Sequence, residues 1–467
     1  MELFFTNTAS RAQEPFHPLQ RAQVRMYTCG PTVYNYVHIG NLRTFLFEDV
    51  LRRTFKVAGY RVTQVMNLTD IDDKTIRGAN AEGISLREYT DRYIEAFFQD
   101  IDTLRCERVE YYPRATDFVP QMVELVAKLK ERGFTYELDG STYFRIAAFA
   151  PYGKLSGIDL SQVKPGARVD ADEYEKEDVR DFVLWKAAKP GEPFWESPFG
   201  PGRPGWHLEC SAMALALLGD SIDLHAGGVD LIFPHHENEI AQSEAATGKP
   251  FVRYWLHAEH LIVEGQKMAK SAGNFYTLRD LLERGYDPLA IRYLLISVPY
   301  RQKLNFTFDG LQAAEGAVQR IGNTLRRLHY TPPAGGDGDL PPAAVQQFVD
   351  DFQHALGDDL NTARALAALH TFLTKLNQAL DGGGLSAEAM SATKAAFRLV
   401  NAVLGVFPEV TAETADAEVE ALVAQRAAAR ARRDFATADA IRRTLLERGI
   451  IVEDTPQGTI WRKAGNV

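Results

Sequence analysis

Apolar and polar positions follow two different periods in the first part of the chain. An apolar run at Val24–Tyr27 precedes a helical pattern at Leu42–Val57, and a second strand-like run follows at Arg61–Asn67. Strands that alternate with helices are typical of a parallel sheet, because a helix must cross over to bring the next strand alongside the first. The pattern therefore predicts an α/β fold.

The pattern changes in the middle of the chain and then returns. Helical periodicity at Leu86–Leu104 and Val119–Arg132 gives way, over residues 135–205, to aromatics, prolines, glycines and short strand-like pieces such as Ser141–Arg145. The alternation then resumes in a helix over Trp206–Leu218, a strand over Ile222–His225 and a helix from Pro234. We therefore expect a doubly wound parallel sheet of Rossmann type, with a connective domain inserted at about residues 110–205.

The remaining third of the chain is helical until close to its end. The helical pattern from about Leu311 is broken by a Pro- and Gly-rich surface loop at Thr331–Pro342, and an acidic, Ala-rich linker follows Pro408. A single helix over Val419–Arg448 and a hairpin, Ile450–Glu453 with Thr459–Arg462, are predicted to end the chain. The predicted domains are a catalytic domain at 1–310, a helical bundle at 311–408 and a small α+β module at 409–467.

Composition narrows the class of protein. The 467 residues are 45% hydrophobic and 24% charged, as in ordinary globular proteins. No apolar run reaches the roughly 18 residues that a membrane span needs, and three scattered cysteines do not form a disulfide framework. We therefore expect a cytoplasmic protein. The net charge of −10 argues against a general polyanion-coating protein, although six arginines gather at 426–443.

Two segments far apart in the chain suit work on a polyphosphate. His38-Ile39-Gly40-Asn41 begins a predicted helix, whose N-terminus offers free N–H groups and a positive dipole to an anion. Gly40 permits close approach of the backbone, and His38 and Asn41 supply donors. Lys267-Met268-Ala269-Lys270-Ser271 lies in a Gly-flanked loop, 265–275, where two ammonium groups can neutralise charge on departing pyrophosphate. We call residues 265–275 the lysine loop.

A metal-ligand set is also indicated. Pro234 at a helix start would place His235 and Glu239 on one face, one turn apart. Cys29, at the end of the first strand, and Cys210 are plausible partners, because the carboxyl ends of strands in a doubly wound sheet meet in one crevice. The alternative is that these residues are two small buried thiols and a polar helix cap. Spacing alone does not decide between the two.

Several longer segments carry a resemblance to a known family. They are Tyr27–Tyr34, His38–Asn41, Asn67–Lys74, Gly202–Met213, Phe233–Glu239, the lysine loop and Glu453–Thr459. With them, the chain resembles the cysteinyl-tRNA synthetases, a family of class I aminoacyl-tRNA synthetases, nearly from end to end. The resemblance implies that L-cysteine is activated with ATP to cysteinyl-adenylate and transferred to the 3′ end of tRNA(Cys).

The resemblance also implies residue roles. The family's zinc ligands correspond to Cys29, Cys210, His235 and Glu239, with one Zn²⁺ per chain that binds the substrate thiolate. The amino-acid pocket corresponds to Gly30, Thr69, Trp206 and Asp230, with Asp230 suited to the ammonium group. His225 would lie near the carboxylate and ATP, and adenylate chemistry falls to His38, Asn41, Lys267 and Lys270. The ATP contacts would be made by Gly40, His225 and Lys270.

The remaining expectations concern Mg²⁺, two positions that differ from the usual family pattern, and the oligomeric state. Mg²⁺ is expected with ATP but has no assignable protein ligand, and we interpret Asp70, Asp72 and Asp73 as structural. Ala269 stands where the lysine loop usually carries Ser, and Ala226 stands where the family usually has Gly. If position 226 requires positive φ, alanine would be strained there. We expect a monomer.

Two other hypotheses compete with the hypothesis of a synthetase. One is a related ligase that transfers activated cysteine to an amino sugar, and the other is a catalytically inactive zinc protein that binds RNA. The basic segment at 426–443 and Trp461 resemble an anticodon-binding module, for which a small-molecule ligase has no use. The intact lysine and histidine positions argue against an inactive protein.

Overall fold

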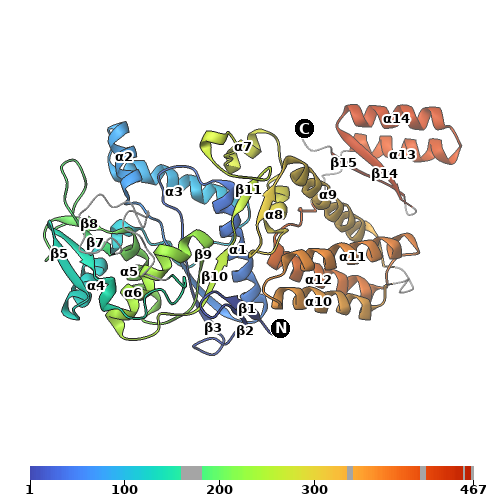
Figure 1. Cartoon of the computed structure of the whole chain (residues 1–467). Coiled ribbons are helices and arrows are strands. Elements are labelled where there is room, and N and C mark those ends of the chain that lie inside the picture. The colour runs from blue at the N-terminus through green and yellow to red at the C-terminus, as the bar shows by residue number, and fades with distance from the viewer. Residues whose placement is uncertain (159–180, 334–339, 411–416, 456–457, 464–467) are drawn as a thin grey trace.

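A parallel four-stranded sheet forms the centre of the molecule (Figure 1). The computed structural model describes residues 1–158, 181–333, 340–410, 417–455 and 458–463. The strand order is β10-β9-β3-β4, and the bounds are β3 Gln23–Thr28, β4 Arg61–Met66, β9 Ile222–Gly228 and β10 Val252–Ala258. Helix α1, Ile39–Val57, connects β3 to β4. The predicted strand, helix and strand at the start of the sheet are confirmed.

Both faces of the sheet are buried. Successive side chains of a strand point to opposite faces, and each face packs against its own hydrophobic core. Val24 and Met26 of β3 pack into the core that contains α1, whereas Tyr27 packs into a second core. Helices α4 Val119–Glu131, α5 Trp206–Leu218 and α6 Glu237–Thr247 supply most of the helical residues of that second core, and Ile76 is added from the helix at Asp73–Glu82. This layering is typical of doubly wound folds.

A separate antiparallel sheet lies between the two halves of the parallel sheet in sequence. Its strands, in order, are β5 Thr135–Leu138, β6 Ser141–Phe144, β7 Phe182–Ala187 and β8 Gly202–Pro204. Helices α2, Asp73–Glu82, and α3, Leu86–Thr103, precede it.

Short elements join the sheet to the helical region. They are the hairpin β1 Phe4–Asn7 with β2 Ala12–Pro15, the sheet of β11 Leu261–Val263, β12 Gln266–Lys267 and β13 Leu304–Phe306, and helices α7 Leu278–Glu283 and α8 Pro288–Ile296. The long helices that follow are α9 Phe308–Tyr330, α10 Pro342–Gly357, α11 Thr362–Asp381 and α12 Ala387–Leu404. One hydrophobic core runs from β3 and α1 through α8 into these helices.

The C-terminal module, residues 417–463, projects from the rest of the molecule (Figure 1). The single helix predicted over Val419–Arg448 is wrong: the structure has two antiparallel helices, α13 Ala417–Ala431 and α14 Phe435–Glu447. Arg433 adopts a left-handed φ of 62°, and the Asp434 side chain accepts the Thr437 backbone N–H to start α14. The predicted hairpin is confirmed as β14 Ile450–Thr455 and β15 Gly458–Lys463.

Parts of two predicted connections lie outside the described residues. These are 334–339 of the Pro- and Gly-rich loop and 411–416 of the Ala-rich linker. Within the described residues, no helix combines the length and apolar character that crossing a bilayer requires.

Candidate active site and metal centre

Cys29 lies directly after β3, at the point where the sheet changes direction. β3 pairs with β4 on one side and β9 on the other, so the connections leave in opposite directions and open a crevice at the carboxyl ends of the strands. The Cys29 backbone N–H bonds to the Ala226 carbonyl of β9 at 3.3 Å. At Gly30 a Cβ would lie 1.8 Å from the Asn67 carbonyl oxygen, so only glycine allows this approach of the two segments.

The four predicted metal ligands come together in this crevice. Ligand atoms of Cys29, Cys210 of α5, His235 and Glu239 of α6 all lie within 4.8 Å of one another, and all four residues are buried. His235 Nε2 and Glu239 Oε1 are 3.1 Å apart. The regular part of α6 begins at Glu237, after a wider turn over Ile232–His236, so the helix starts later than predicted while the His–Glu pairing holds. This donor set of thiol, imidazole and carboxylate fits a borderline metal ion.

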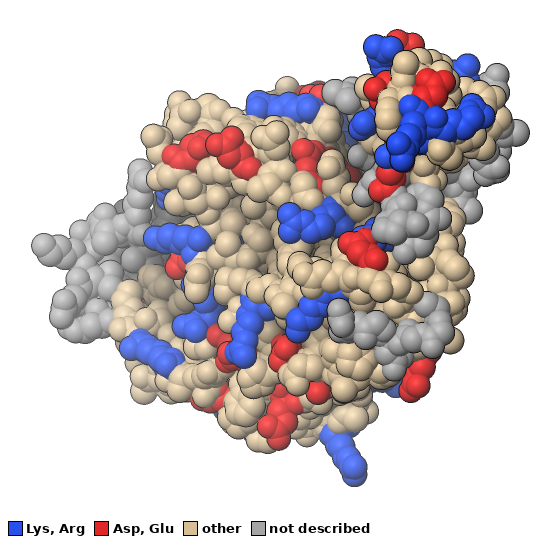
Figure 2. All heavy atoms as spheres, turned by 90° about the vertical axis from the view of Figure 1, so that its right-hand side faces the viewer, with Lys and Arg blue, Asp and Glu red and all other residues tan. Residues whose placement is uncertain are grey.

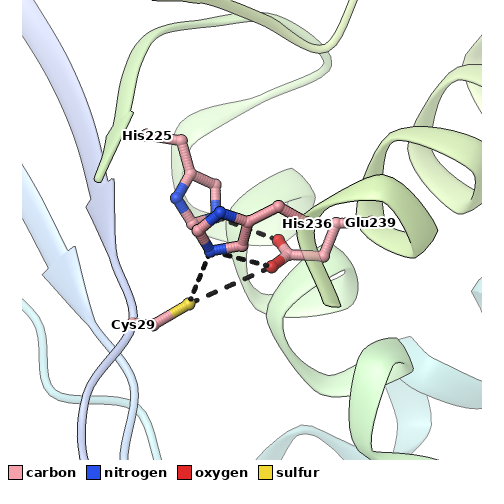
Figure 3. Close-up of side chains that lie close together, drawn as sticks. All are labelled: Cys29, His225, His236 and Glu239. Carbon is pink, nitrogen blue, oxygen red and sulfur yellow. Dashed lines mark hydrogen bonds and ion pairs between the residues drawn. The ribbon is translucent and has the colours of Figure 1, made fainter. Parts of the chain in front are cut away.

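A second set of potential ligands shares two residues with the first (Figure 3). It consists of Cys29, His225 of β9, His236 and Glu239. Cys29 Sγ lies 3.3 Å from His236 Nε2, and His225 Nε2 lies 3.0 Å from Glu239 Oε2. His236 in turn contacts His257 of β10 across 2.8 Å.

Two buried histidines of this region, His236 and His257, were not predicted from the sequence. Their positions in the sequence offered a signal. His236 directly follows a predicted ligand, and His257 is a polar residue among buried apolar neighbours near the carboxyl end of β10. Burial first, and then the charge of His225, lower the pKa of His257 to about 3; burial and neighbouring histidines lower that of His236 as well. Both imidazoles are therefore neutral and suited to hydrogen bonding rather than to carrying charge.

The two sulfurs of the cluster differ in protonation. Burial raises the pKa of the Cys210 thiol, but the hydrogen bond from Cys29 and the neighbouring His235 charge outweigh burial and lower it to about 6. Burial and the hydrogen bond to Cys210 raise the pKa of Cys29 well above its ordinary value. The Cys29 thiol therefore donates a hydrogen bond to a Cys210 thiolate.

The other two members carry opposite charges. Burial opposes ionisation of Glu239, but His225 and His235 overcome it and lower the pKa of the carboxyl to about 2. Burial opposes protonation of His235, but Cys210 and Glu239 raise its pKa to about 10. Protonated His235 is therefore the cation that lies between the Cys210 thiolate and the Glu239 carboxylate. A metal ion can take over that role with release of the proton.

The predicted amino-acid pocket residues lie at different depths. Thr69 is buried, and its hydroxyl donates to Glu209 Oε2 at 3.0 Å. The Trp206 ring stacks on His235, with centroids 4.4 Å apart, and so forms one wall of the metal-ligand cluster. Asp230 is exposed on the short turn after β9 and is not part of the buried cluster. His225 is fully buried against Trp255 and Glu239.

The two segments predicted to act on a polyphosphate, 38–41 and 267–271, meet at the start of α1, and we call them the ATP signatures. His38 caps the helix by accepting the Asn41 backbone N–H at 3.1 Å, and the Asn41 side chain accepts the His38 N–H in return. A Cβ on Gly40 would lie 3.3 Å from the methyl carbon of Met268, so the lysine loop approaches this turn closely. Lys267 is exposed at the end of β12. The backbone of Lys270 begins a 3-10 turn, and its side chain lies outside the described residues.

The aspartates at 70–73 have structural partners, as interpreted from the sequence. Asp70 accepts the Thr116 backbone N–H at 2.9 Å, Asp72 caps α2, and Asp73 pairs with Arg203 and Lys186. The possible strain at Ala226 is absent: the residue lies within β9, paired with Leu256, and has no positive φ. Ala269 keeps its backbone N–H bonded to Asn274 Oδ1 at 2.8 Å.

Three family models match successive parts of the chain. Residues 15–316 match the class I (C) tRNA synthetase catalytic domain, residues 351–408 match the DALR domain, and residues 413–462 match the cysteinyl-tRNA ligase anticodon binding domain. The first match alone covers more than half of the chain.

Similar proteins match over nearly the full length. A cysteine–tRNA ligase of Solibacter usitatus is 52% identical over 99% of this chain and 100% of that protein, and one of Chlamydia pneumoniae is 50% identical over 98% and 97%. Among solved structures, Mycobacterium tuberculosis methionyl-tRNA synthetase with methionyl-adenylate has a TM-score of 0.61 at 16% identity, covering 82% of this chain and 92% of that one. The structural likeness shows the fold, and the sequence matches show that the chain belongs to the cysteine–tRNA ligase family of class I aminoacyl-tRNA synthetases.

Proposed function

We propose that a zinc ion held by Cys29, Cys210, His235 and Glu239 selects L-cysteine for the ligase reaction of this chain. The observation that carries the proposal is the buried convergence of these four ligand atoms at the carboxyl end of β3. Two sulfurs, an imidazole nitrogen and a carboxylate oxygen are the ligands that zinc prefers. All four belong to one chain, which supports a monomer as the working unit.

Selection against serine is the problem that such a site solves. Cysteine and serine differ by one atom, and a pocket lined by apolar groups rejects a hydroxyl isostere by only about a hundredfold. When bound, zinc supplies a position that prefers a thiolate to an alcohol. With that preference available, the chain has no need of a second, editing site.

The chain's own residues prepare this position. Cys210 is already ionised near neutral pH because its pKa is about 6, and Glu239 is ionised because its pKa is about 2. His225 holds Glu239 Oε2 at 3.0 Å, so the carboxylate keeps its orientation. Trp206 stacks on His235 and keeps water from that side of the ring. Gly30, Thr69 and Asp230 then complete the cysteine pocket, with Asp230 receiving the ammonium group.

Activation itself requires positioning and charge stabilisation. The cysteine carboxylate attacks the α-phosphate of ATP in line and pyrophosphate leaves, with no covalent enzyme intermediate. His38, Gly40 and Asn41 at the start of α1 hold the phosphates, His225 lies behind the carboxylate, and Lys267 and Lys270 neutralise the departing charge. Mg²⁺ accompanies ATP. A terminal ribose hydroxyl of tRNA(Cys), whose anticodon part is bound by the C-terminal module, then attacks the cysteinyl carbonyl of the adenylate, so that the ester forms and AMP leaves.

Metal analysis and ATP–pyrophosphate exchange together test the proposal. Purified chain is expected to contain one zinc and to catalyse exchange with cysteine but not with serine. Cys210→Ser is expected to lose both the metal and the exchange. The matched control is Cys106→Ser, because Cys106 is the remaining cysteine and packs against the other core. Full exchange by metal-free chain, or equal loss in both variants, would contradict zinc selection.

A further inference from the structure

Arginines from the catalytic part bind the carboxyl end of α12, where the chain leaves for the C-terminal module. We call Asp49, Arg53, Arg105 and Arg292 the arginine socket. The guanidinium groups of the three arginines donate to the backbone carbonyls of Ala402 and Leu404 at the end of α12 and of Phe407 just beyond it. The last carbonyls of a helix have no partner within the helix and form the negative end of its dipole, so cations stabilise them.

Arg292 of α8 is the buried centre of the socket. Its side chain has 0% exposure, and it donates from Nε to Leu404 O at 2.6 Å and from Nη1 to Leu104 O at 2.8 Å. A third bond, from Nη2 to Asp49 Oδ2 at 2.5 Å, supplies the countercharge. A fully buried cation with three partners from three different segments determines how those segments lie relative to one another.

Asp49 and Arg53 extend the socket along α1. Arg53 donates from Nε to Asp49 Oδ2 at 2.8 Å, from Nη1 to Ala402 O at 3.1 Å and from Nη2 to Arg105 O at 2.6 Å. Asp49 Oδ1 accepts the Glu107 backbone N–H at 2.8 Å. Arg105 donates to Phe407 O at 2.8 Å, one residue before Pro408.

Gly405 shows how closely the helix end fits the socket. It ends α12 with a left-handed φ of 65°, and a Cβ there would lie 2.9 Å from Arg292 Nε and 3.0 Å from its Cζ. Any side chain at 405 would therefore push against the guanidinium group and strain the backbone as well.

The socket lies on the helix that begins with the first ATP signature. His38 caps α1, and Asp49 follows eleven residues later on the same helix, about 16 Å along its axis. We propose that the arginine socket is a positioning device: it sets the direction of the chain at Pro408, and thereby the distance between the ATP site and the tRNA-bound module. The inference rests on the proposed tRNA role of that module. It makes tRNA charging, and not cysteine activation, depend on Arg53 and Arg292.

The test compares two neighbouring arginines of α1 in the full chain. Arg53→Gln removes the bonds to Ala402 and Arg105, and KM for tRNA is expected to rise roughly tenfold, the loss expected for hydrogen bonds to a charged group. Cysteine-dependent ATP–pyrophosphate exchange is expected to stay within about twofold, because the metal ligands and ATP signatures are untouched. Gly405→Ala, which displaces Arg292 from the other side, is expected to act in the same direction.

Arg52→Gln is the matched control. Arg52 lies next to Arg53 on α1, with 7% of its side chain exposed against 12% for Arg53, but it pairs with Glu107 and Glu110 on the catalytic side, at 3.1 and 2.7 Å. Its KM for tRNA is expected to stay near that of the unaltered chain. An unchanged KM in Arg53→Gln and Gly405→Ala, or an equal rise in Arg52→Gln, would overturn the inference. If the unaltered chain itself shows no cysteine-dependent ATP–pyrophosphate exchange, the proposed function is overturned, and the inference with it.

Discussion

The metal-ligand cluster and the C-terminal module are held together in opposite ways. The cluster draws its ligands from the end of β3, from α5 and from the start of α6, and every one of them is buried. The module instead has a small core of its own, built on Val419, Leu445, Ile450 and Val452. The cluster therefore depends on packing between segments that are far apart in the sequence, whereas the module has hydrophobic contacts of its own.

Charge differs between these two regions as well. In the cluster, opposite charges meet in full burial and shift each other's pKa values strongly. In the module, Figure 2 shows Lys and Arg side chains together with Asp and Glu on the part that projects at the top of this face. Of the module's arginines, Arg426 is buried and paired with Asp454, while Arg432, Arg433, Arg442 and Arg443 are exposed. The exposed ones are available to phosphates.

Aromatic side chains of the module divide in the same manner. Trp461 of β15 is partly buried, because it packs against the module's core. Phe435 at the start of α14 is 60% exposed and presents a ring to solvent. We therefore expect Phe435, rather than Trp461, to meet unpaired bases.

Removal of the module should produce the largest effect, because it is expected to reduce tRNA charging strongly while cysteine activation continues. A chain that ends at Pro408 keeps both ATP signatures and all four metal ligands, so exchange with cysteine and ATP is expected to remain near its full rate. Charging of tRNA is expected to fall more than about a hundredfold, because the exposed arginines and Phe435 are lost. Pyrophosphate exchange and aminoacylation measured on the same preparations check both parts.

A salt series sharpens this result. Charging by the full chain is expected to fall steeply as salt rises, and residual charging by the shortened chain less steeply, because fewer phosphate contacts remain to be screened. Equal charging by both chains would contradict the role of the module and would favour a ligase that acts on a small amine.

Lys270 tests the catalytic region alone. Lys270→Ala is expected to slow adenylate formation about a hundredfold if one ammonium group supplies about 3 kcal/mol to the transition state. The KM for cysteine should change little, because the metal-ligand cluster is unaltered. Single-turnover formation of adenylate measures the rate, and Lys249→Ala, an exposed lysine after α6, is the control. A normal rate with a raised KM for ATP would assign Lys270 to ground-state binding.

The sequence predicted the centre of the fold well because period and chemistry agreed there. The run at Val24–Tyr27 and the pattern at Leu42–Val57 became β3 and α1, and the pairing of His235 with Glu239 is present. Each prediction depended on local period or one helical turn, which sequence spacing expresses directly.

Features that depend on three-dimensional packing were missed. His236 and His257 meet only because β10 lies beside β9, which no spacing along the chain reveals. The break at Arg433 was hidden because arginine is a good helix former, although Asp434 followed by Thr437 is a possible start signal for a helix. The strain considered at Ala226 depended on a φ value that the sequence does not contain.

Asp454 tests the stability of the module with a smaller effect. It accepts two bonds from Arg426, at 2.6 and 2.8 Å, and also pairs with Arg430. These arginines lower the pKa of Asp454 well below its ordinary value of about 4, so its stabilising contribution is present above that pH and is lost as the pH falls below it. Asp454→Asn is expected to destabilise the module by about 1–2 kcal/mol at neutral pH.

Hydrogen exchange of the β14 and β15 amides measures that change, since these strands form one wall of the module's core. The difference between Asp454→Asn and the unaltered chain should shrink as the pH is lowered below about 4, because the aspartate of the unfolded chain then binds a proton while that of the folded module is still ionised. Glu447→Gln, at an exposed position of α14, serves as the control for loss of one negative charge. Faster exchange in the parallel sheet would contradict the independence of the two regions.

Ala226 should give the smallest effect and tests how tightly the catalytic region is built. The residue is fully buried within β9, pairs with Leu256 and Thr28, and its carbonyl accepts the Cys29 N–H. Because its backbone is extended, Ala226→Gly relieves no strain; it adds backbone freedom to the unfolded chain and is expected to lower stability by about 1 kcal/mol. Exchange with cysteine should stay within about twofold. Denaturant unfolding measures the change in stability, and the kinetics of ATP–pyrophosphate exchange measure the change in activity. A several-fold faster ATP–pyrophosphate exchange in the glycine variant would show that alanine does restrict the metal-ligand cluster.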